Sequence, residues 1–237
     1  MRKLINYLHR LLLDNEEMMK YLKDRGMTIE MIKKFKLGKF PDEPVNVLRY
    51  ADAKFLIDDA EILYSSFNGF KSMFSRNKLI IPIYDVYNDL IGIAGRILVS
   101  DEVIKKHGLP KYVNSKYNKR SHLFGLNIAK DVIRDKNEAF IVEGYFDVIS
   151  AHQAGFKNVV AACGTAFGNG QVNLLARYTD RFNILFDNDP PGRVAADTIL
   201  KKQKSKKRIK IIKKQIKEFN DLDELLRSGK TVEEYVE

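Results

Sequence analysis

The chain has 237 residues, of which 45% are hydrophobic, and this is enough to bury a core and to exclude a largely disordered protein. Its 41 Lys and Arg residues exceed its 31 Asp and Glu residues, which gives a net charge of +10. This excess favours a polyanionic partner, although a surface of solvated lysines is an alternative.

Cysteine content and apolar runs restrict the class of protein further. Cys163 is the only cysteine, which excludes an internal disulfide and a multi-cysteine zinc site. No apolar run approaches the roughly 20 residues of a membrane span, and Arg2 and Lys3 are not followed by a signal-peptide pattern. We therefore expect a cytoplasmic protein with no membrane partner.

The first 37 residues predict short helices, because apolar residues recur at helical spacing in 4–12 and 18–22. Asp14 or Asn15 is suited to cap a second helix, and Thr28 begins a third helix. Farther along the chain, apolar runs at 79–83 and 90–95 flank a polar turn and predict a β-hairpin. Residues 101–120 are polar and basic, and we predict a loop there.

Strands and helices alternate from residue 138 onward. Apolar runs predict four strands, at 139–142, 158–162, 182–186 and 209–212. Helical segments lie between them, at 146–154, 170–178 and 192–203. Alternation at this spacing predicts an α/β fold with a parallel sheet and crossover helices.

Acidic residues follow two of these predicted strands. Glu143 comes after the first strand, and Asp187 and Asp189 come after the third. Because ligands of an open parallel sheet bind outside the carboxyl ends of its strands, the three carboxylates would meet at one edge if these strands are neighbours. Carboxylates without nearby His or Cys suit Mg²⁺ or Mn²⁺. The alternative is that residues 187–192 form a turn and a helix N-cap.

A second set consists of basic and aromatic residues. Residues 71–120 hold ten Lys or Arg against four Asp or Glu, with tyrosines interleaved. A basic groove with aromatic rings suits single-stranded nucleic acid, and the alternative is a solvated surface over core tyrosines. The cations concerned are Arg76, Lys78, Arg96, Lys111, Lys116, Lys119 and Arg120.

Two further charged segments have simpler interpretations. The run from Lys201 to Lys217 holds ten Lys or Arg and no acid, and we interpret it as a helix end and a strand with solvated lysines. The acidic cluster at 221–226 is typical of a helix N-terminus, where carboxylates complement the helix dipole.

Three motifs mark the second half of the chain: Glu-Gly-Tyr-Phe-Asp at 143–147, Gly-Thr at 164–165 and Phe-Asp-Asn-Asp-Pro-Pro-Gly-Arg at 186–193. Others precede them, at 21–26, 32–38, 76–83, 92–96, 110–115 and 123–126. In this order, the set resembles the polymerase core and Toprim domain of the DnaG-type primases of bacteria and phages. The first motif alone is shared with other Toprim proteins, whereas the ordered set is specific.

The resemblance implies a mixed α+β N-terminal subdomain, residues 1–135, followed by a Toprim domain, residues 137–237. It implies a nucleotidyltransferase that makes short RNA primers on single-stranded DNA from nucleoside triphosphates (NTPs). The family's catalytic acids fall on Glu143, Asp187 and Asp189, which would bind Mg²⁺ or Mn²⁺. A later acidic pair that would hold a further metal ion falls on Asp221 and Asp223. The residues that would bind template, triphosphate or nascent RNA are Arg76, Lys78, Arg96, Lys111, Tyr112 and Lys119.

The sequence also departs from the family pattern. The N-terminal zinc ribbon of full-length members cannot be built with one cysteine, so we expect no zinc in this chain. We also expect no helicase-binding domain, and the expected partner is a replicative helicase or a separate zinc-bearing subunit. Two other functions remain open: a Toprim nuclease that uses the same acids, and a non-catalytic accessory protein that binds single-stranded DNA.

Overall fold

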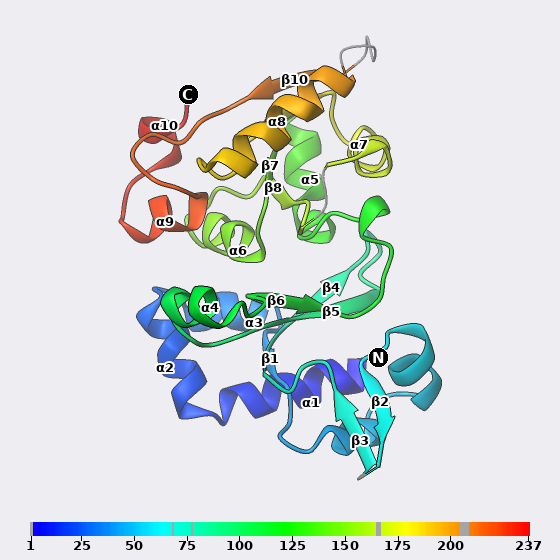
Figure 1. Cartoon of the computed structure of the whole chain (residues 1–237). Helices are drawn as coiled ribbons and strands as arrows, with labels where there is room; N and C mark the ends of the chain where they lie inside the picture. The colour runs from blue at the N-terminus through cyan, green and yellow to red at the C-terminus, as the bar shows by residue number, and fades with distance from the viewer. Residues whose placement is uncertain (1, 68, 77, 165–166, 204–208) are drawn as a thin grey trace. The chain divides into compact units, whose positions relative to one another are not determined.

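The computed structural model describes residues 2–67, 69–76, 78–164, 167–203 and 209–237 (Figure 1). Contacts divide the chain into an N-terminal unit, Met1–Tyr84 with Leu90–Tyr117, and a C-terminal unit, Asp85–Asp89 with Asn118–Glu237. The domain boundary near residue 136 stays a prediction. No helix within the described ranges is long and apolar enough to cross a membrane.

The three helices predicted at the N-terminus are present as α1 (Arg2–Leu13), α2 (Glu16–Asp24) and α3 (Ile29–Lys34). Asn15 caps α2, and its side-chain oxygen accepts a hydrogen bond from the backbone N–H of Met18 at 2.9 Å. Thr28 caps α3 in the same way. Helix α1 buries one apolar face, and this face joins the core of the N-terminal unit.

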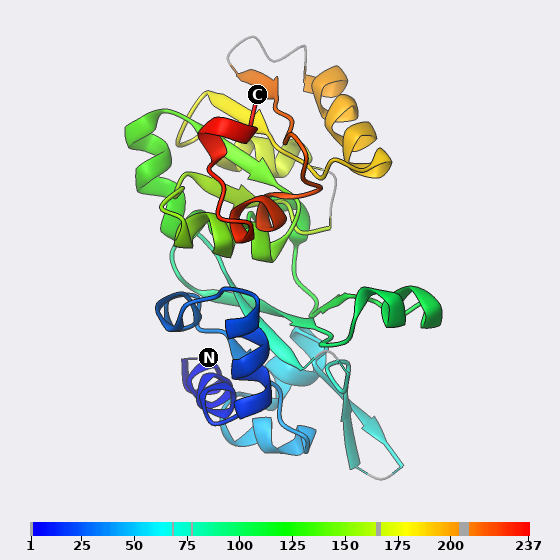
Figure 2. The same ribbon diagram turned by 90° about the vertical axis from the view of Figure 1, so that its left-hand side faces the viewer.

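The N-terminal unit contains an antiparallel sheet with the strand order β1-β4-β5-β6. Its strands are β1 (Gly38–Lys39), β4 (Leu79–Tyr84), β5 (Leu90–Arg96) and β6 (Tyr112–Asn114). The predicted hairpin is confirmed as β4 and β5. Strands β2 (Leu63–Ser66) and β3 (Gly69–Ser72) form a separate hairpin that projects from this unit (Figure 2). A 3-10 helix, Pro44–Arg49, and a π-helix, Phe55–Asp59, lie between β1 and β2.

The prediction of a loop over residues 101–120 was wrong. This segment contains α4 (Asp101–His107), strand β6 and a 3-10 helix, Lys119–Ser121. Ser100 caps α4, and Gly108, with a φ of 59°, ends it in the left-handed conformation. Helix α4 has few apolar residues because most of it is exposed, so its caps are its main signal in the sequence.

The parallel sheet predicted for the second half is confirmed, with the strand order β10-β9-β7-β8. Its strands are β7 (Ala139–Val142), β8 (Val159–Ala161), β9 (Arg181–Ile184) and β10 (Lys210–Lys213). The helices are α5 (Leu126–Lys136), α6 (Tyr145–Gln153), α7 (Asn169–Leu175), α8 (Pro190–Gln203), α9 (Leu222–Arg227) and α10 (Val232–Tyr235). Residues 204–208 of the basic run lie outside the described residues.

Apolar side chains hold this sheet against its helices. One buried cluster joins residues of α5, α7 and α8 to Ile141, Phe182 and Ile184 of the central strands. Helix α6 contacts β8 and packs along α9 (Figure 1). This packing fixes the carboxyl ends of β7 and β9 side by side.

A buried glutamine ties the segment that carries Lys119 to α7. The side chain of Gln171 donates hydrogen bonds to the carbonyl oxygens of Lys119 at 3.2 Å and His122 at 2.9 Å. A Cβ on Gly170 would lie 2.4 Å from the carbonyl oxygen of Arg120, so only glycine allows this approach. Lys119 therefore has a defined position in the C-terminal unit.

We predict that Gln171→Leu destabilises the protein by about 2–4 kcal/mol, because the carbonyl groups of Lys119 and His122 lose their buried donor. The measurement is the free energy of unfolding in urea. The exposed Gln153 provides the control, and Gln153→Leu should change that energy by less than about 0.5 kcal/mol. Equal stabilities of the two variants would contradict the structural role of Gln171.

Candidate active site

The structure brings Glu143 and Asp187 together at the carboxyl ends of two neighbouring strands. Strand β7 pairs with β9, and the side chain of Glu143 accepts a hydrogen bond from the backbone N–H of Asp187 at 3.1 Å. Gly192 makes this approach possible. A Cβ at Gly192 would lie 2.3 Å from the carbonyl oxygen of Asp187 and 2.8 Å from Oε1 of Glu143.

Asp189 takes part in the start of α8. Its Oδ1 accepts a hydrogen bond from the backbone N–H of Gly192 at 2.8 Å, and its carbonyl oxygen accepts one from Arg193 at 3.1 Å. The alternative interpretation of residues 187–192, a turn followed by a helix N-cap, therefore describes the local structure. It is compatible with a role in binding, because the Asp189 carboxylate still acts electrostatically on Glu143 and Asp187.

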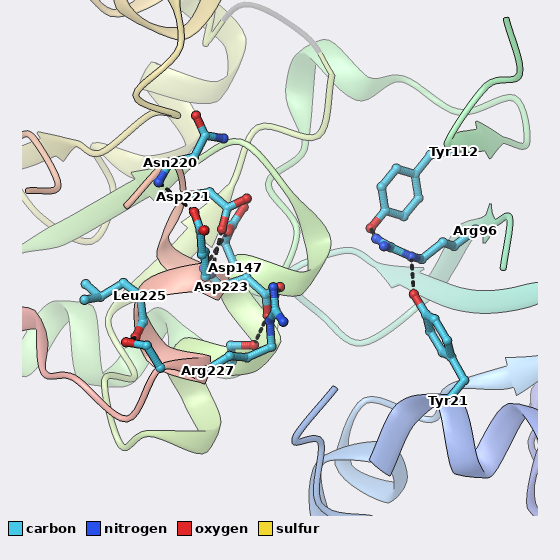
Figure 3. Close-up of polar contacts among 12 residues, drawn as sticks. Tyr21, Arg96, Tyr112, Asp147, Asn220, Asp221, Asp223, Leu225 and Arg227 are labelled. Carbon is cyan, nitrogen blue, oxygen red and sulfur yellow. Dashed lines mark hydrogen bonds and ion pairs between the residues drawn. The ribbon is translucent and has the colours of Figure 1, made fainter. Parts of the chain in front are cut away.

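Asp147 ends the first motif, but no role was predicted for it from the sequence. Asp147 is buried on α6, where its carboxylate accepts hydrogen bonds from the backbone N–H of Gly144 at 2.9 Å and of Asp223 at 3.0 Å (Figure 3). It thus joins the loop after β7 to the start of α9. Its spacing of four residues from Glu143 is the signal that could have identified it.

Asp221 and Asp223 lie at the start of α9, as the helix interpretation of this cluster predicts. Asp221 caps the helix and accepts a hydrogen bond from the N–H of Glu224 at 2.7 Å. The two oxygens of Asp223 accept hydrogen bonds from Ser150 at 2.5 Å and from Arg227 at 3.0 Å (Figure 3). The charge of Asp221 also contributes to the raised pKa of Asp187.

Asn188, between the two aspartates of the third motif, holds the segment that leads to Asp221. Its side-chain amide donates hydrogen bonds to the carbonyl oxygens of Ile216 at 3.1 Å and Phe219 at 3.5 Å. Its backbone N–H donates to Asn220 at 2.6 Å. Asn188 therefore fixes the second acidic segment beside the first, which the sequence did not indicate.

Burial and mutual repulsion raise the pKa values of these acids. The pKa of Asp187 rises to about 8, mainly through burial and then through Asp147, Glu143, Asp221 and Asp189. Burial, followed by the charge of Asp221, raises the pKa of Asp147 to about 7. The pKa of Glu143 is also raised, mainly by burial. A bound cation would relieve this repulsion.

The donor chemistry of this cluster fits a hard divalent cation. Every acidic side chain in it offers carboxylate oxygens, the ligands that Mg²⁺ and Mn²⁺ prefer. Over the described part of the chain, no three His, Cys, Asp or Glu side chains are already arranged to hold a metal ion. The carboxylates are thus close enough to interact electrostatically, but they do not form a closed set of ligands.

Of the predicted basic set, Lys119 and Arg120 belong to the C-terminal unit. Lys119 lies beside the acidic cluster. Its ammonium group interacts with Cys163, whose backbone N–H donates a hydrogen bond to the carbonyl oxygen of Glu143 at 3.1 Å. Burial lowers the pKa of Lys119. A partly desolvated lysine beside the loop after β7 is suited to contact an anionic ligand there. Thr165, in the neighbouring motif, lies outside the described residues.

The other predicted basic residues lie in the N-terminal unit. The side chain of Arg96 is buried and donates hydrogen bonds to the hydroxyl groups of Tyr21, at 3.1 Å, and Tyr112 (Figure 3). Lys78 forms an ion pair with Asp42, whereas Arg76 and Lys111 are exposed. Arg96 therefore positions two tyrosine rings within its own unit.

Comparisons with known proteins agree with this architecture. A family model described as the DNA primase catalytic core, N-terminal domain, matches residues 7–130, and a Toprim-like model matches residues 140–226. The chain belongs to the DNA primase catalytic core family. The resemblance inferred from the ordered motifs is thereby confirmed.

Individual relatives show how much of a primase the chain spans. It is 38% identical over 191 residues to the DNA primase of Aquifex aeolicus, which covers 78% of this chain and 37% of the relative. It is 35% identical over 198 residues to the DNA primase of Clostridium acetobutylicum, with coverages of 80% and 32%. The chain thus spans about a third of the length of these curated relatives.

Solved primase structures have the same fold. The structure of the zinc-binding and RNA polymerase domains of Aquifex aeolicus primase matches with a TM-score of 0.83 and 32% identity, over 96% of this chain and 56% of that chain. The structure of a DnaG primase catalytic domain bound to single-stranded DNA matches with a TM-score of 0.82 and 28% identity, over 96% and 75%.

We predict a pH-dependent difference in stability between the wild-type chain and Asp187→Asn, measured without divalent cations. The folded state raises the pKa of Asp187 to about 8, so the stability from its protonated form is complete below pH 4 and is lost as the pH rises toward 8. The neutral amide does not titrate. From pH 5 to pH 8, the free energy of unfolding should therefore fall by at least about 1 kcal/mol more in the wild type.

The measurement is urea denaturation at both pH values in the presence of EDTA. Asp131→Asn serves as the control, because Asp131 is exposed and pairs with Arg134 on the surface. This variant should follow the wild-type pH dependence. The same pH dependence in Asp187→Asn would show that the carboxyl group of Asp187 is not perturbed as described.

We further predict that Asn188→Ala loosens the second acidic segment, because the carbonyl oxygens of Ile216 and Phe219 lose their donor. Amide hydrogen exchange in residues 216–224 should become at least about tenfold faster, which corresponds to about 1.4 kcal/mol. Asn127→Ala removes an exposed amide that bonds Asn88 and should leave this exchange unchanged. Unchanged exchange in both variants would show that other contacts hold the segment.

Proposed function

We propose that this chain is the catalytic core of a DNA primase, a nucleotidyltransferase that synthesises short RNA primers on single-stranded DNA for replication. The observation that carries the proposal is the cluster of carboxylates at the carboxyl ends of β7 and β9, in a chain that belongs to this family. Perturbed acids at the edge of a parallel sheet are typical of a functional site.

We assign metal binding to Glu143, Asp187, Asp189 and Asp221. A divalent cation held there would reduce the charge that builds up on the attacking and leaving oxygens. Asp223 remains a predicted ligand, but its two oxygens already accept hydrogen bonds from Ser150 and Arg227. Its role in this proposal is to fix α9, and Asp221 provides the ligand from this pair.

The reaction joins the 3′-hydroxyl group of the growing RNA to the α-phosphate of an incoming NTP, and pyrophosphate leaves. The protein contributes mainly positioning and charge stabilisation. Glu143 either binds the cation or accepts the proton of the attacking hydroxyl group. Lys119, close to the loop after β7, is suited to bind a phosphate of the NTP.

The N-terminal unit would supply contacts to nucleic acid. Arg76, Lys78 and Lys111 offer cations for phosphates, and Tyr112 offers a ring for stacking that Arg96 holds in place. One primase structure with the same fold is described as bound to single-stranded DNA, which supports a template of this kind. A replicative helicase or a zinc-bearing subunit as a further partner stays a prediction.

The test is to incubate the purified chain with single-stranded DNA, labelled NTPs and Mg²⁺ or Mn²⁺. We expect labelled oligoribonucleotides, and we expect Asp187→Asn and Asp189→Asn each to reduce synthesis at least about a hundredfold, because charge stabilisation is lost. Both variants should still bind DNA. Asp131→Asn, which changes an exposed surface carboxylate, should keep full activity.

The alternative functions give different products in the same assay. Shortened DNA would indicate a nuclease, and a gel shift without any product would indicate an accessory binding protein. Near wild-type synthesis by both aspartate variants would show that these acids do not carry the reaction.

A further inference from the structure

The N-terminal unit contains a pocket of about 570 Å³ that the residues discussed so far account for only in part. Its volume lies within the usual range for a small-molecule site. The wall is formed by residues before and within α2, by β1 and the loop after it, by the residues just before β4, and by the segments that follow β5 and α4. Arg76 and Lys78 belong to it, but most of its lining has no assigned role.

One wall of this pocket holds two lysines that share one carboxylate. Asp42 forms ion pairs with Lys39, at 3.2 Å, and with Lys78. The pairing of β1 with β4 fixes the backbones of the two lysines as neighbours, since the N–H of Phe40 donates to the carbonyl oxygen of Lys78 at 2.8 Å. The sheet therefore brings the two lysine side chains out from neighbouring backbone positions.

The two partners differ in how firmly they are held. The lysine side chains are 17% and 33% exposed, whereas the Asp42 side chain is 70% exposed on a loop between two prolines. Hydrogen bonds from Lys78 and Lys39 lower the pKa of Asp42, so it is an anion at neutral pH. An exposed carboxylate paired with less exposed lysines is a weak local partner that another anion can replace.

Another part of the wall is apolar, beside Asn15 and Glu17. Met18 is buried there, and Leu98, Val99 and Leu109 complete this surface, with Val99 41% exposed. A ligand that fits both parts of the wall carries an anionic group and a flat or apolar group. A nucleotide unit, with its phosphate and its base, has this chemistry.

We propose that this pocket binds a nucleotide unit, with the phosphate on Lys39 and Lys78 and the base against the apolar wall, and that Asp42 occupies the phosphate position until the ligand displaces it. The inference rests on the proposed function and extends it by assigning Asp42 as a competitor built into the site. The nucleotide unit comes from a single-stranded nucleic acid or from a free triphosphate.

The test measures binding rather than synthesis. Removal of the carboxylate by Asp42→Asn frees both lysines, so the affinity for the ligand should rise by about three- to tenfold at low salt. The log–log salt dependence of binding to a single strand should steepen by up to about 0.7 for each lysine that regains a counterion. Fluorescence anisotropy with a labelled 16-nucleotide oligodeoxynucleotide and with a labelled NTP gives both quantities.

Two further variants make the result specific. Asp24→Asn is the matched control, because Asp24 also pairs with a lysine at 3.0 Å, on α2, but does not line the pocket. It should leave both affinities unchanged apart from the small effect of net charge. Lys78→Ala introduced into Asp42→Asn should abolish the gain.

The outcomes separate the two sources of the ligand. A gain for the oligonucleotide alone assigns the pocket to the strand, and a gain for the NTP alone assigns it to the triphosphate. Equal behaviour of Asp42→Asn and Asp24→Asn with both probes would overturn the proposal. The binding measurements do not depend on synthesis. Failure of primer synthesis would therefore count against the proposed function, and the binding result could still be interpreted.

Discussion

The central constraint in the C-terminal unit is that several buried or half-buried carboxylates lie close together at one edge of a parallel sheet. Backbone N–H groups stabilise them. Asp147, Asp189 and Asp221 each accept a hydrogen bond from an N–H group in the first turn of α6, α8 or α9, or from the residue just before it. The positive ends of three helix dipoles thus lie beside these carboxylates and partly offset their mutual repulsion.

This arrangement links fold and function. Residues that hold the helix starts in place also determine where the carboxylates lie, so Asn188 and Gly192 matter for the site although neither carries a charge. The repulsion that remains is expressed in the raised pKa values of Asp187 and Asp147. Because these carboxylates repel one another, binding of a cation gains additional free energy by removing that repulsion.

The charged side chains of the N-terminal unit are arranged differently from the acidic cluster of the C-terminal unit. Three cations of the N-terminal unit are held by local partners: Arg96 by two tyrosine hydroxyl groups, and Lys39 and Lys78 by Asp42. Net positive charge alone therefore overstates how many cations a nucleic acid meets. What matters is which local partner a phosphate can replace, and an exposed carboxylate is easier to replace than a buried tyrosine.

Apolar periodicity and strand ends are local signals, so the parallel sheet, the hairpin at β4 and β5, and the position of Glu143 and Asp187 just after two strands could be predicted from the sequence. The helix α4 was not predicted, because this exposed helix has little apolar periodicity. The tertiary structure was needed to show that β7 lies beside β9, that Asp147 joins two acidic segments, and that Asp42 pairs with two lysines. These contacts join residues far apart in the chain, so no local pattern records them.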